Sequence, residues 1–220
     1  MNQPLSSENS EFVPTYLNGV HTPVQSEWEG ILTEIKGEIP KALKGIFARN
    51  SANPRFEPIG RDHWFDGDGM IHAFTFDEGR VHYKRKYTQT AGYQAEDKAQ
   101  QALWSGILER PQPGLATPLK DTANTDLTWH NNRFLASWWL SGIPQSVDAE
   151  LTSHGSASFT QDLMKHTTVA AHPKVDPLNQ DLMFFGYNLF KPPYYTYGVV
   201  NAKGQLEHQI TVDVQVGLWH

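Results

Sequence analysis

The chain of 220 residues contains no cysteine, and this absence excludes several kinds of site at once. Without cysteine there is no disulfide, no thiolate nucleophile and no zinc site with sulfur ligands. Any metal ion would have to be bound by histidine and carboxylate side chains, and the chain carries 10 histidines.

Long hydrophobic runs and an excess of basic residues are absent as well. The longest apolar stretches, such as residues 182–185, fall far short of the roughly 20 residues that a transmembrane helix needs. The chain has 18 Lys and Arg against 24 Asp and Glu, a formal net charge of −6 that disfavours a nucleic-acid partner. Hydrophobic residues make up 39% and charged residues 19%, which indicates a soluble globular protein with a sizeable core.

Several catalytic signatures are missing too. There is no His-Glu-x-x-His zinc helix, no Gly-x-Ser-x-Gly nucleophile elbow and no glycine-rich phosphate loop followed by lysine, so hydrolase and nucleotide-binding functions lose their main support. Residues 1–13 are polar and contain no basic or apolar segment typical of a signal peptide. We therefore expect a disordered tail over residues 1–13 and a cytoplasmic protein.

Short stretches rich in β-branched and aromatic residues alternate with turn residues along the chain. Four pairs of stretches predict β-hairpins: 70–76 with 80–88, 126–130 with 133–140, 166–172 with 181–188, and 194–200 with 205–220. One helix is predicted near residues 95–104, ending at Gly106. The succession of hairpins favours an all-β antiparallel architecture, either a sandwich or a propeller of repeated meanders.

One acidic, glycine-rich segment, residues 64–70, precedes a predicted strand. Asp66 and Asp68 are spaced as in calcium loops, but no glutamate closes the site at the right distance. We interpret the segment as a structural turn in which Gly67 and Gly69 take positive φ and the carboxylates cap backbone donors. The polar residues 120–127 are likewise interpreted as a turn.

Two histidines stand out by position. His172 lies at the predicted end of a strand, where Pro173 stops the ladder; a lone histidine there is more often structural, although histidine is the commonest metal ligand. His220 ends a run in which every second residue from Leu206 onward is Leu, His, Ile or Val, so it is expected on the core side with a partner for a ring nitrogen. His208 shares that phase, and the pattern alone does not separate a ligand from a core residue.

Several short sequence motifs, in their order along the chain, resemble those of one protein family. They occupy residues 37–50, 52–54, 63–72, 124–125, 171–174 and 185–187, and the most specific are Trp-Phe-Asp-Gly-Asp-Gly-Met-x-His and Ala-His-Pro-Lys. Over residues 14–220 the chain resembles the carotenoid cleavage oxygenases, a family that also contains stilbene-cleaving dioxygenases and the retinoid isomerase of the visual cycle.

The resemblance implies a seven-bladed β-propeller with one non-haem Fe(II) on its axis, held by four histidines. His172 matches the first iron ligand and His220 the place of the second. The implied reaction is O2-dependent cleavage of a conjugated C=C bond in a carotenoid or apocarotenoid, giving carbonyl products. Imidazole ligands leave metal positions free for O2, and an apolar tunnel suits a lipophilic polyene, whose chemistry is also compatible with peripheral membrane contact.

The sequence departs from the family pattern in the stretch 136–141. Family members carry there a glutamate that hydrogen-bonds an iron ligand, whereas this stretch contains Trp138 and Trp139 and no acid. Such a loss costs about 10–100-fold in metal affinity or activity. The lysine that stilbene-cleaving members often carry near this place is also absent, which favours a carotenoid substrate.

The family's chains are considerably longer, so the resemblance implies that this chain is the N-terminal part of the propeller. The third and fourth ligands are unaccounted for, since His63, His72 and His130 match no ligand phrase. We therefore expect that the chain alone, an open ring with an exposed sheet edge, neither binds iron tightly nor turns over substrate. The alternatives are a non-catalytic family member and an enzyme that cleaves stilbenes or isomerises retinoids.

Overall fold

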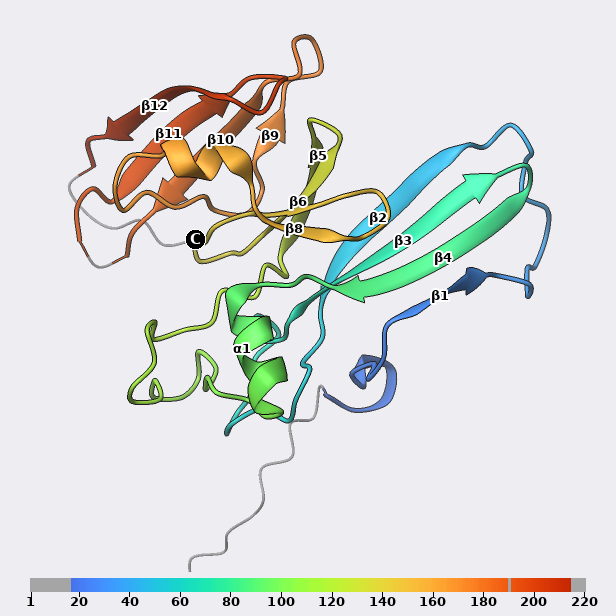
Figure 1. Cartoon of the computed structure of the whole chain (residues 1–220), viewed down its shortest axis with the longest axis horizontal. Helices are drawn as coiled ribbons and strands as arrows, with labels where there is room; N and C mark the ends of the chain where they lie inside the picture. Colours follow the sequence, from blue (N-terminus) through green and yellow to red (C-terminus); the bar gives the residue numbers. More distant parts are fainter. Residues whose placement is uncertain (1–16, 190, 215–220) are drawn as a thin grey trace, which may run out of the picture.

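The computed structural model describes residues 17–189 and 191–214, which form three four-stranded antiparallel sheets (Figure 1). The first has the order β1-β4-β3-β2, with β1 (Trp28–Ile31), β2 (Gly45–Ala52), β3 (Gly69–Asp77) and β4 (Arg80–Tyr87). The second runs in chain order through β5 (Asp126–His130), β6 (Arg133–Ser137), β7 (Gln145–Val147) and β8 (Ser153–Ser156). The third contains β9 (Lys174–Val175), β10 (Leu182–Tyr187), β11 (Tyr195–Val200) and β12 (Leu206–Val212), also in chain order. The antiparallel β architecture predicted from the sequence is confirmed, and the chain is mostly β instead of all-β.

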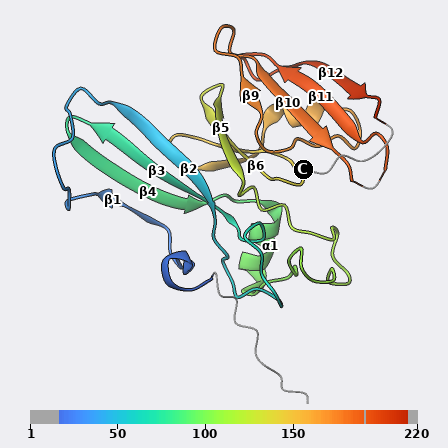
Figure 2. The ribbon, with the colours of Figure 1, turned by 180° about the vertical axis from the view of Figure 1, so that it is seen from behind.

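The second sheet lies between the other two, as the views from opposite sides show (Figures 1 and 2). Residues 1–16, 190 and 215–220 lie outside the described part of the chain, so the expected tail and His220 have no structural description.

Two of the predicted hairpins close through loops of two residues. β3 joins β4 across Glu78 (φ 48°) and Gly79 (φ 75°), and β5 joins β6 across Asn131 (φ 47°) and Asn132 (φ 57°). Positive φ at both loop positions defines the type I′ turn, whose twist matches the twist of the paired strands. Local sequence therefore specifies both hairpins.

The strand predicted over residues 166–172 is not formed. The strand that pairs with β10 is β9, which begins two residues after His172. His172 has a left-handed backbone (φ 69°) that interrupts an extended ladder, and Pro173 has no N–H to continue it. The N–H of Ala170 bonds to β10 whereas that of Ala171 bonds to Trp138 at the end of β6, so the segment bridges two sheets.

The predicted helix is displaced toward the N-terminus, because α1 spans Ala91–Ala99. The hydroxyl of Thr90 accepts a backbone N–H of the first turn and caps the helix, and Gln100 (φ 55°) ends it in the left-handed conformation. The carboxylate of Glu96 then accepts two backbone N–H groups from the following residues, which therefore form a loop. No helix within residues 17–189 and 191–214 is long and apolar enough to cross a membrane.

Two apolar cores lie between the sheets, and β6 contributes to both. Phe134 and Ala136 pack toward the first sheet against Ile71 and Ala73. Leu135, which points to the opposite face of β6, packs toward the third sheet. The other buried members of this second core are Ala157, Phe159, Val169, Leu182, Phe184 and Val200.

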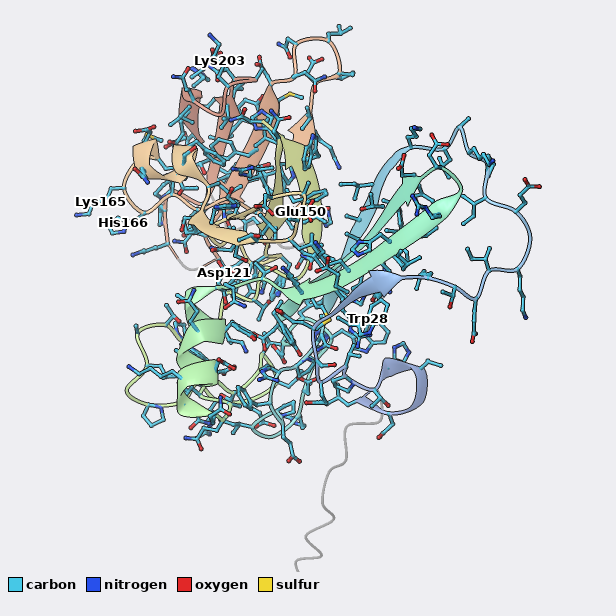
Figure 3. The ribbon with its side chains drawn as sticks, turned by 45° about the vertical axis from the view of Figure 1, so that its right-hand side comes forward. Trp28, Asp121, Glu150, Lys165, His166 and Lys203 are labelled. Carbon is cyan, nitrogen blue, oxygen red and sulfur yellow. The ribbon has the colours of Figure 1, made fainter. Side chains whose placement is uncertain are left out.

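The outward faces of the first and third sheets carry rows of aromatic rings. On the first sheet, the Phe74 ring lies 6.1 Å from that of Phe47 and 4.7 Å from that of Tyr83. Trp28, labelled in Figure 3, packs 5.7 Å from Tyr83, and Phe47 and Trp28 are 58% and 42% exposed. The stacked rings on the third sheet are Phe185, Tyr187 and Tyr195.

The core phase predicted for the last strand is wrong because β12 contains a β-bulge. Val199 pairs with His208, but Val200 pairs with Leu206, so one extra residue intervenes. Leu206 therefore packs against the second core, whereas His208 and Ile210 share the aromatic outward face. Ile210 is accordingly 43% exposed.

Candidate functional site

The edge strands β2, β5 and β9 of the three sheets lie near one another (Figure 1). Hydrogen bonds join this region to His172, which precedes β9. The amide Nδ2 of Asn50, in β2, donates to the carbonyl oxygens of Ala123 (2.7 Å) and Asp126 (3.3 Å). The backbone N–H of His172 donates to the carboxylate of Asp126 at 3.1 Å. The first residue of β5 thus connects β2 with the segment that leads into β9.

The backbone of His172 is in an unfavourable conformation. A φ of 69° costs a non-glycine residue about 1–3 kcal/mol and persists only where the surroundings impose it. Here the N–H groups of Ala171 and His172 are both bonded, to the carbonyl of Trp138 (3.1 Å) and to Asp126. Such outliers cluster at functional sites, and this one presents a histidine that is 61% exposed in its side chain.

Asp126 contacts the ring of His172 as well as its backbone. Its Oδ1 lies 3.6 Å from Nδ1 of the imidazole, and its Oδ2 also accepts the Thr128 hydroxyl at 3.0 Å. The carboxylate side chain is 26% exposed. Because the acid lies on the Nδ1 side, Nε2 is the ring nitrogen available for a metal.

Three histidines match no iron-ligand motif of the family, and all three have structural partners: His63, His72 and His130. His72 contacts the Ser51 hydroxyl (3.0 Å) and the Tyr83 hydroxyl (2.7 Å), and burial lowers its pKa to about 4. His130 contacts a backbone carbonyl through Nε2 at 3.1 Å, and burial lowers its pKa too. The ring of His63 packs 4.7 Å from a phenylalanine and accepts a backbone N–H. We therefore assign none of them to the site at His172.

Within the described residues, His172 fits one ligand position of a metal centre. In this described part of the chain, no group of three or more His, Asp or Glu side chains is placed to hold a metal ion. His172 supplies one exposed imidazole with a carboxylate behind it, a donor arrangement typical of a metal ligand. His220 lies outside the described residues, so its assignment stays a prediction.

The acidic, glycine-rich segment ahead of β3 is structural, but for a different reason than predicted. Neither Gly67 nor Gly69 has positive φ. A Cβ on Gly67 would lie 2.8 Å from the backbone nitrogen of Asn53, and one on Gly69 would lie 2.6 Å from the carbonyl oxygen of Ala123. Glycine is required by close backbone approach. The predicted capping is confirmed for Asp66, which accepts two backbone N–H groups.

A buried charged cluster, which the sequence analysis missed, lies beside this segment. Lys120 Nζ is 3.0 Å from Asp68 Oδ1 and 2.6 Å from Glu96 Oε2, and the three side chains are at most 11% exposed. Asp62 lines the same small cavity of about 40 Å³ and is 3% exposed. Burial, with a contribution from the charge of Asp66, raises the pKa of Asp62 to about 7. No spacing in the sequence links these residues.

Aromatic rings occupy the stretch where the family pattern has an acid. Trp139 packs 5.3 Å from Phe65, and its backbone N–H donates to the Thr125 hydroxyl at 3.0 Å. Trp138 is 8% exposed. The stretch after β6 is therefore held by packing and backbone hydrogen bonds.

A groove of about 610 Å³ opens beside Thr125, the neighbour of Asp126. Its lining combines the apolar side chains of Val20, Trp64 and Phe65 with polar groups that include Arg49 and His72. The rings of Trp64 and Phe65 are 57% and 42% exposed. The groove could receive an aromatic or polyene ligand close to the site.

Comparison with known proteins finds relatives that are described as oxygenases. Residues 21–220 match the protein family described as retinal pigment epithelial membrane protein. Carotenoid 9,10(9′,10′)-cleavage dioxygenase 1 of Arabidopsis thaliana is 30% identical over 220 residues, covering 90% of this chain and 40% of the relative. The chain thus spans about 40% of the length of the first curated relatives it matches.

Two solved structures are similar as well. The crystal structure of lignostilbene dioxygenase from Pseudomonas brassicacearum superposes with a TM-score of 0.78 at 30% identity, covering 90% of this chain and 42% of that one. A cobalt-substituted apocarotenoid oxygenase of Synechocystis gives a TM-score of 0.66 at 28% identity, covering 86% and 42%.

Proposed function

Because the chain belongs to the retinal pigment epithelial membrane protein family, the carotenoid cleavage oxygenases, we propose that it forms part of an oxygenase that cleaves a conjugated C=C bond with O2. The proposed substrate is a lipophilic polyene, a carotenoid or apocarotenoid, and the products are two carbonyl compounds. Since the chain spans about 40% of its curated relatives, the proposal concerns the protein in its full natural length.

The observation that carries the proposal is the placement of His172 near the edge strands of the three sheets. Its exposed imidazole, with Asp126 on the Nδ1 side, suits a metal ligand. We propose Fe(II) as the metal, held by His172, by His220 and by histidines outside this chain. When bound, the iron would supply the activation of O2.

The chain's own residues have the tasks of binding the substrate and holding the backbone of His172. The exposed rings of Trp64 and Phe65 offer apolar surface to a polyene in the groove beside Thr125. Trp139, after the end of β6, packs 5.3 Å from Phe65 and supports this wall of the groove. Hydrogen bonds from the N–H groups of Ala171 and His172 hold the backbone at this position.

We further propose that the three sheets are blades of a seven-bladed propeller. Aromatic rows on the outward faces of the first and third sheets support this proposal, because half-exposed rings such as Phe47 and Trp28 are normally covered by another layer. In a closed ring each of these faces would pack against a further sheet.

The test is product analysis of the full-length protein under ¹⁸O2 with a carotenoid, an apocarotenoid and a stilbene. A dioxygenase places label in the carbonyl products, whereas a retinoid isomerase places none. His172→Ala should abolish product formation. Absence of turnover with every substrate, in an iron-loaded and folded preparation, would support the alternative of a non-catalytic family member.

Stilbene cleavage is the second candidate, favoured by the TM-score of 0.78 to lignostilbene dioxygenase. The stilbene arm of the same experiment separates the two. Greater activity on the stilbene than on either carotenoid substrate would reassign the substrate class and leave the reaction type unchanged.

A further inference from the structure

We propose that Asp126 is a positioning residue that fixes the imidazole of His172 in the Nδ1–H tautomer and directs Nε2 toward a metal. The metal part of this inference rests on the proposed function. The tautomer part concerns the chain's own residues and is testable without metal.

The carboxylate of Asp126 contacts both the backbone N–H and the ring of His172. Oδ2 accepts the backbone N–H of His172 at 3.1 Å. Oδ1 lies 3.6 Å from Nδ1 of the ring, within electrostatic contact and a few tenths of an ångström beyond hydrogen-bond distance. The backbone of His172 is left-handed, with φ at 69°, so its side-chain direction depends on contacts that hold this conformation. Asp126 supplies such a contact and faces the ring with its second oxygen.

Asp126 is itself held in place. Its Oδ2 accepts the Thr128 hydroxyl at 3.0 Å, and its carbonyl accepts Nδ2 of Asn50 at 3.3 Å. As the first residue of β5 it also pairs with Ser137 of β6. The backbone of Asp126 is therefore bonded to two sheets, and the Thr128 hydroxyl holds its carboxylate at Oδ2.

The chemistry of imidazole turns this contact into a choice of tautomer. Neutral histidine carries one N–H, and a carboxylate accepts only, so the nitrogen that faces Asp126 is favoured as the protonated one. Nε2 then keeps its lone pair, which is the form that binds a metal ion. Within the described residues, no other acid contacts His172.

The chain contains a matched control, a second Asp and His pair in an exposed hairpin. Nε2 of His154 lies 2.8 Å from Oδ2 of Asp148. There the acid faces Nε2, and neither residue lies among the β2, β5 and β9 edges. Asp148→Asn removes a carboxylate from a histidine without touching the site.

The first measurement is the ¹⁵N NMR spectrum of the metal-free, full-length protein with labelled histidine at about pH 8, where imidazole is neutral. The His172 signals are assigned by comparison with His172→Ala. Wild type should show a protonated Nδ1. In Asp126→Asn the amide oxygen can keep the two hydrogen bonds at Oδ2, which turns its NH2 toward the ring and should move the proton to Nε2.

The second measurement is Co(II) affinity of the same proteins. Asp126→Asn should bind Co(II) about 10–100-fold more weakly, and Thr128→Val, which frees the carboxylate without removing it, should give a smaller loss in the same direction. Asp148→Asn should match wild type in both measurements. Circular dichroism checks that each variant is folded.

Two results would overturn the inference. One is a wild-type His172 protonated on Nε2, and the other is an Asp126→Asn variant whose tautomer and Co(II) affinity equal those of wild type. A protein that shows the expected tautomer and the expected loss of Co(II) affinity but cleaves no C=C bond would contradict the proposed function and leave the role of Asp126 intact.

Discussion

The ammonium group of Lys120 lies 2.6 Å from the carboxylate of Glu96, and both side chains are almost completely buried. This pair joins the connection that precedes β5 to the helix α1, and Asp68 at 3.0 Å adds the end of the loop before β3. Three segments distant in sequence therefore depend on one buried cation.

Replacement of Lys120 by Met should destabilise the fold by about 3–5 kcal/mol, because Glu96 and Asp68 would keep buried charges without a partner. Urea denaturation followed by circular dichroism measures the change. Lys165→Met, at an exposed position labelled in Figure 3, is the control and should stay within about 0.5 kcal/mol of wild type. Equal stability of the two variants would contradict the prediction.

The ion pair between Lys84 and Glu150 should matter much less, although it links the first two sheets. Lys84 Nζ lies 2.7 Å from Glu150 Oε2, but the Glu150 side chain, labelled in Figure 3, is 78% exposed. The Lys84 side chain is only 9% exposed, but its Nζ also lies 3.4 Å from Glu29 Oε1, so it keeps an acidic partner when Glu150 is replaced. Water screens the exposed carboxylate of Glu150, which limits the contribution of this pair to about 0–1 kcal/mol. Glu150→Ala should lower the free energy of unfolding by no more than about 1 kcal/mol. A loss as large as that of Lys120→Met would show that the exposure of the acid does not limit the contribution of the pair.

The contribution of Asp62 to the free energy of unfolding should fall as pH rises. Its pKa is raised from 3.8 to about 7 in the fold, mainly by burial, so the folded chain holds this proton more tightly than the unfolded chain. The contribution is fully present below about pH 4 and is lost as pH rises through about 7. Asp62→Asn, which stays neutral, should lack this part of the decline.

The difference between wild type and Asp62→Asn should grow by about 2–4 kcal/mol between pH 4 and pH 8, measured by urea denaturation at each pH. Asp162→Asn, at an exposed position, should follow wild type. Parallel curves for wild type and Asp62→Asn would mean that the carboxyl of Asp62 is not titrating abnormally.

Gly67→Ala should destabilise the chain through steric contact, by about 1–3 kcal/mol, since the new Cβ would lie 2.8 Å from the backbone nitrogen of Asn53. Gly114→Ala is the comparison, because Gly114 has φ +82° and open space around the Cβ position. It should show only the conformational cost, about 1 kcal/mol. Thermal denaturation that ranked Gly114→Ala as the more harmful change would refute the steric explanation.

The chain of 220 residues should not retain iron when expressed alone. Its described part supplies one imidazole, and a single histidine does not hold Fe(II) through purification. Metal analysis after gel filtration checks this, with the full-length protein as the positive control. Stoichiometric iron in a monomeric preparation of the 220-residue chain would contradict the prediction.

The parts of the fold that sequence predicted well are those with local causes. The hairpins closed by Glu78-Gly79 and Asn131-Asn132 need only two residues that accept positive φ. The β-bulge in β12 depends on pairing with β11, so alternation along the strand placed His208 on the wrong side. Residues after α1 looked helical by composition, but the carboxylate of Glu96 holds their backbone in a loop.

The candidate site divides in the same way. The Ala-His-Pro-Lys motif points to His172, but its predicted position at the end of a strand is wrong, because His172 follows a segment that bridges two sheets. Asp126 was missed because 46 residues separate it from His172 and no motif joins them. The family pattern predicts an acid in the stretch 136–141, whereas the acid that contacts His172 lies in β5, the strand paired with β6.

The alternation along β6 has a consequence for the way the molecule opens. Phe134 and Ala136 belong to one core and Leu135 to the other. The middle sheet is therefore packed on both faces, against a different neighbour on each face. Separation of either outer sheet would wet one side of β6 while the other side stays packed, a partly opened state that is costly in free energy. We expect the amide hydrogens of β6 to exchange with solvent only in global unfolding, and those of the peripheral strands β1 and β12 to exchange first.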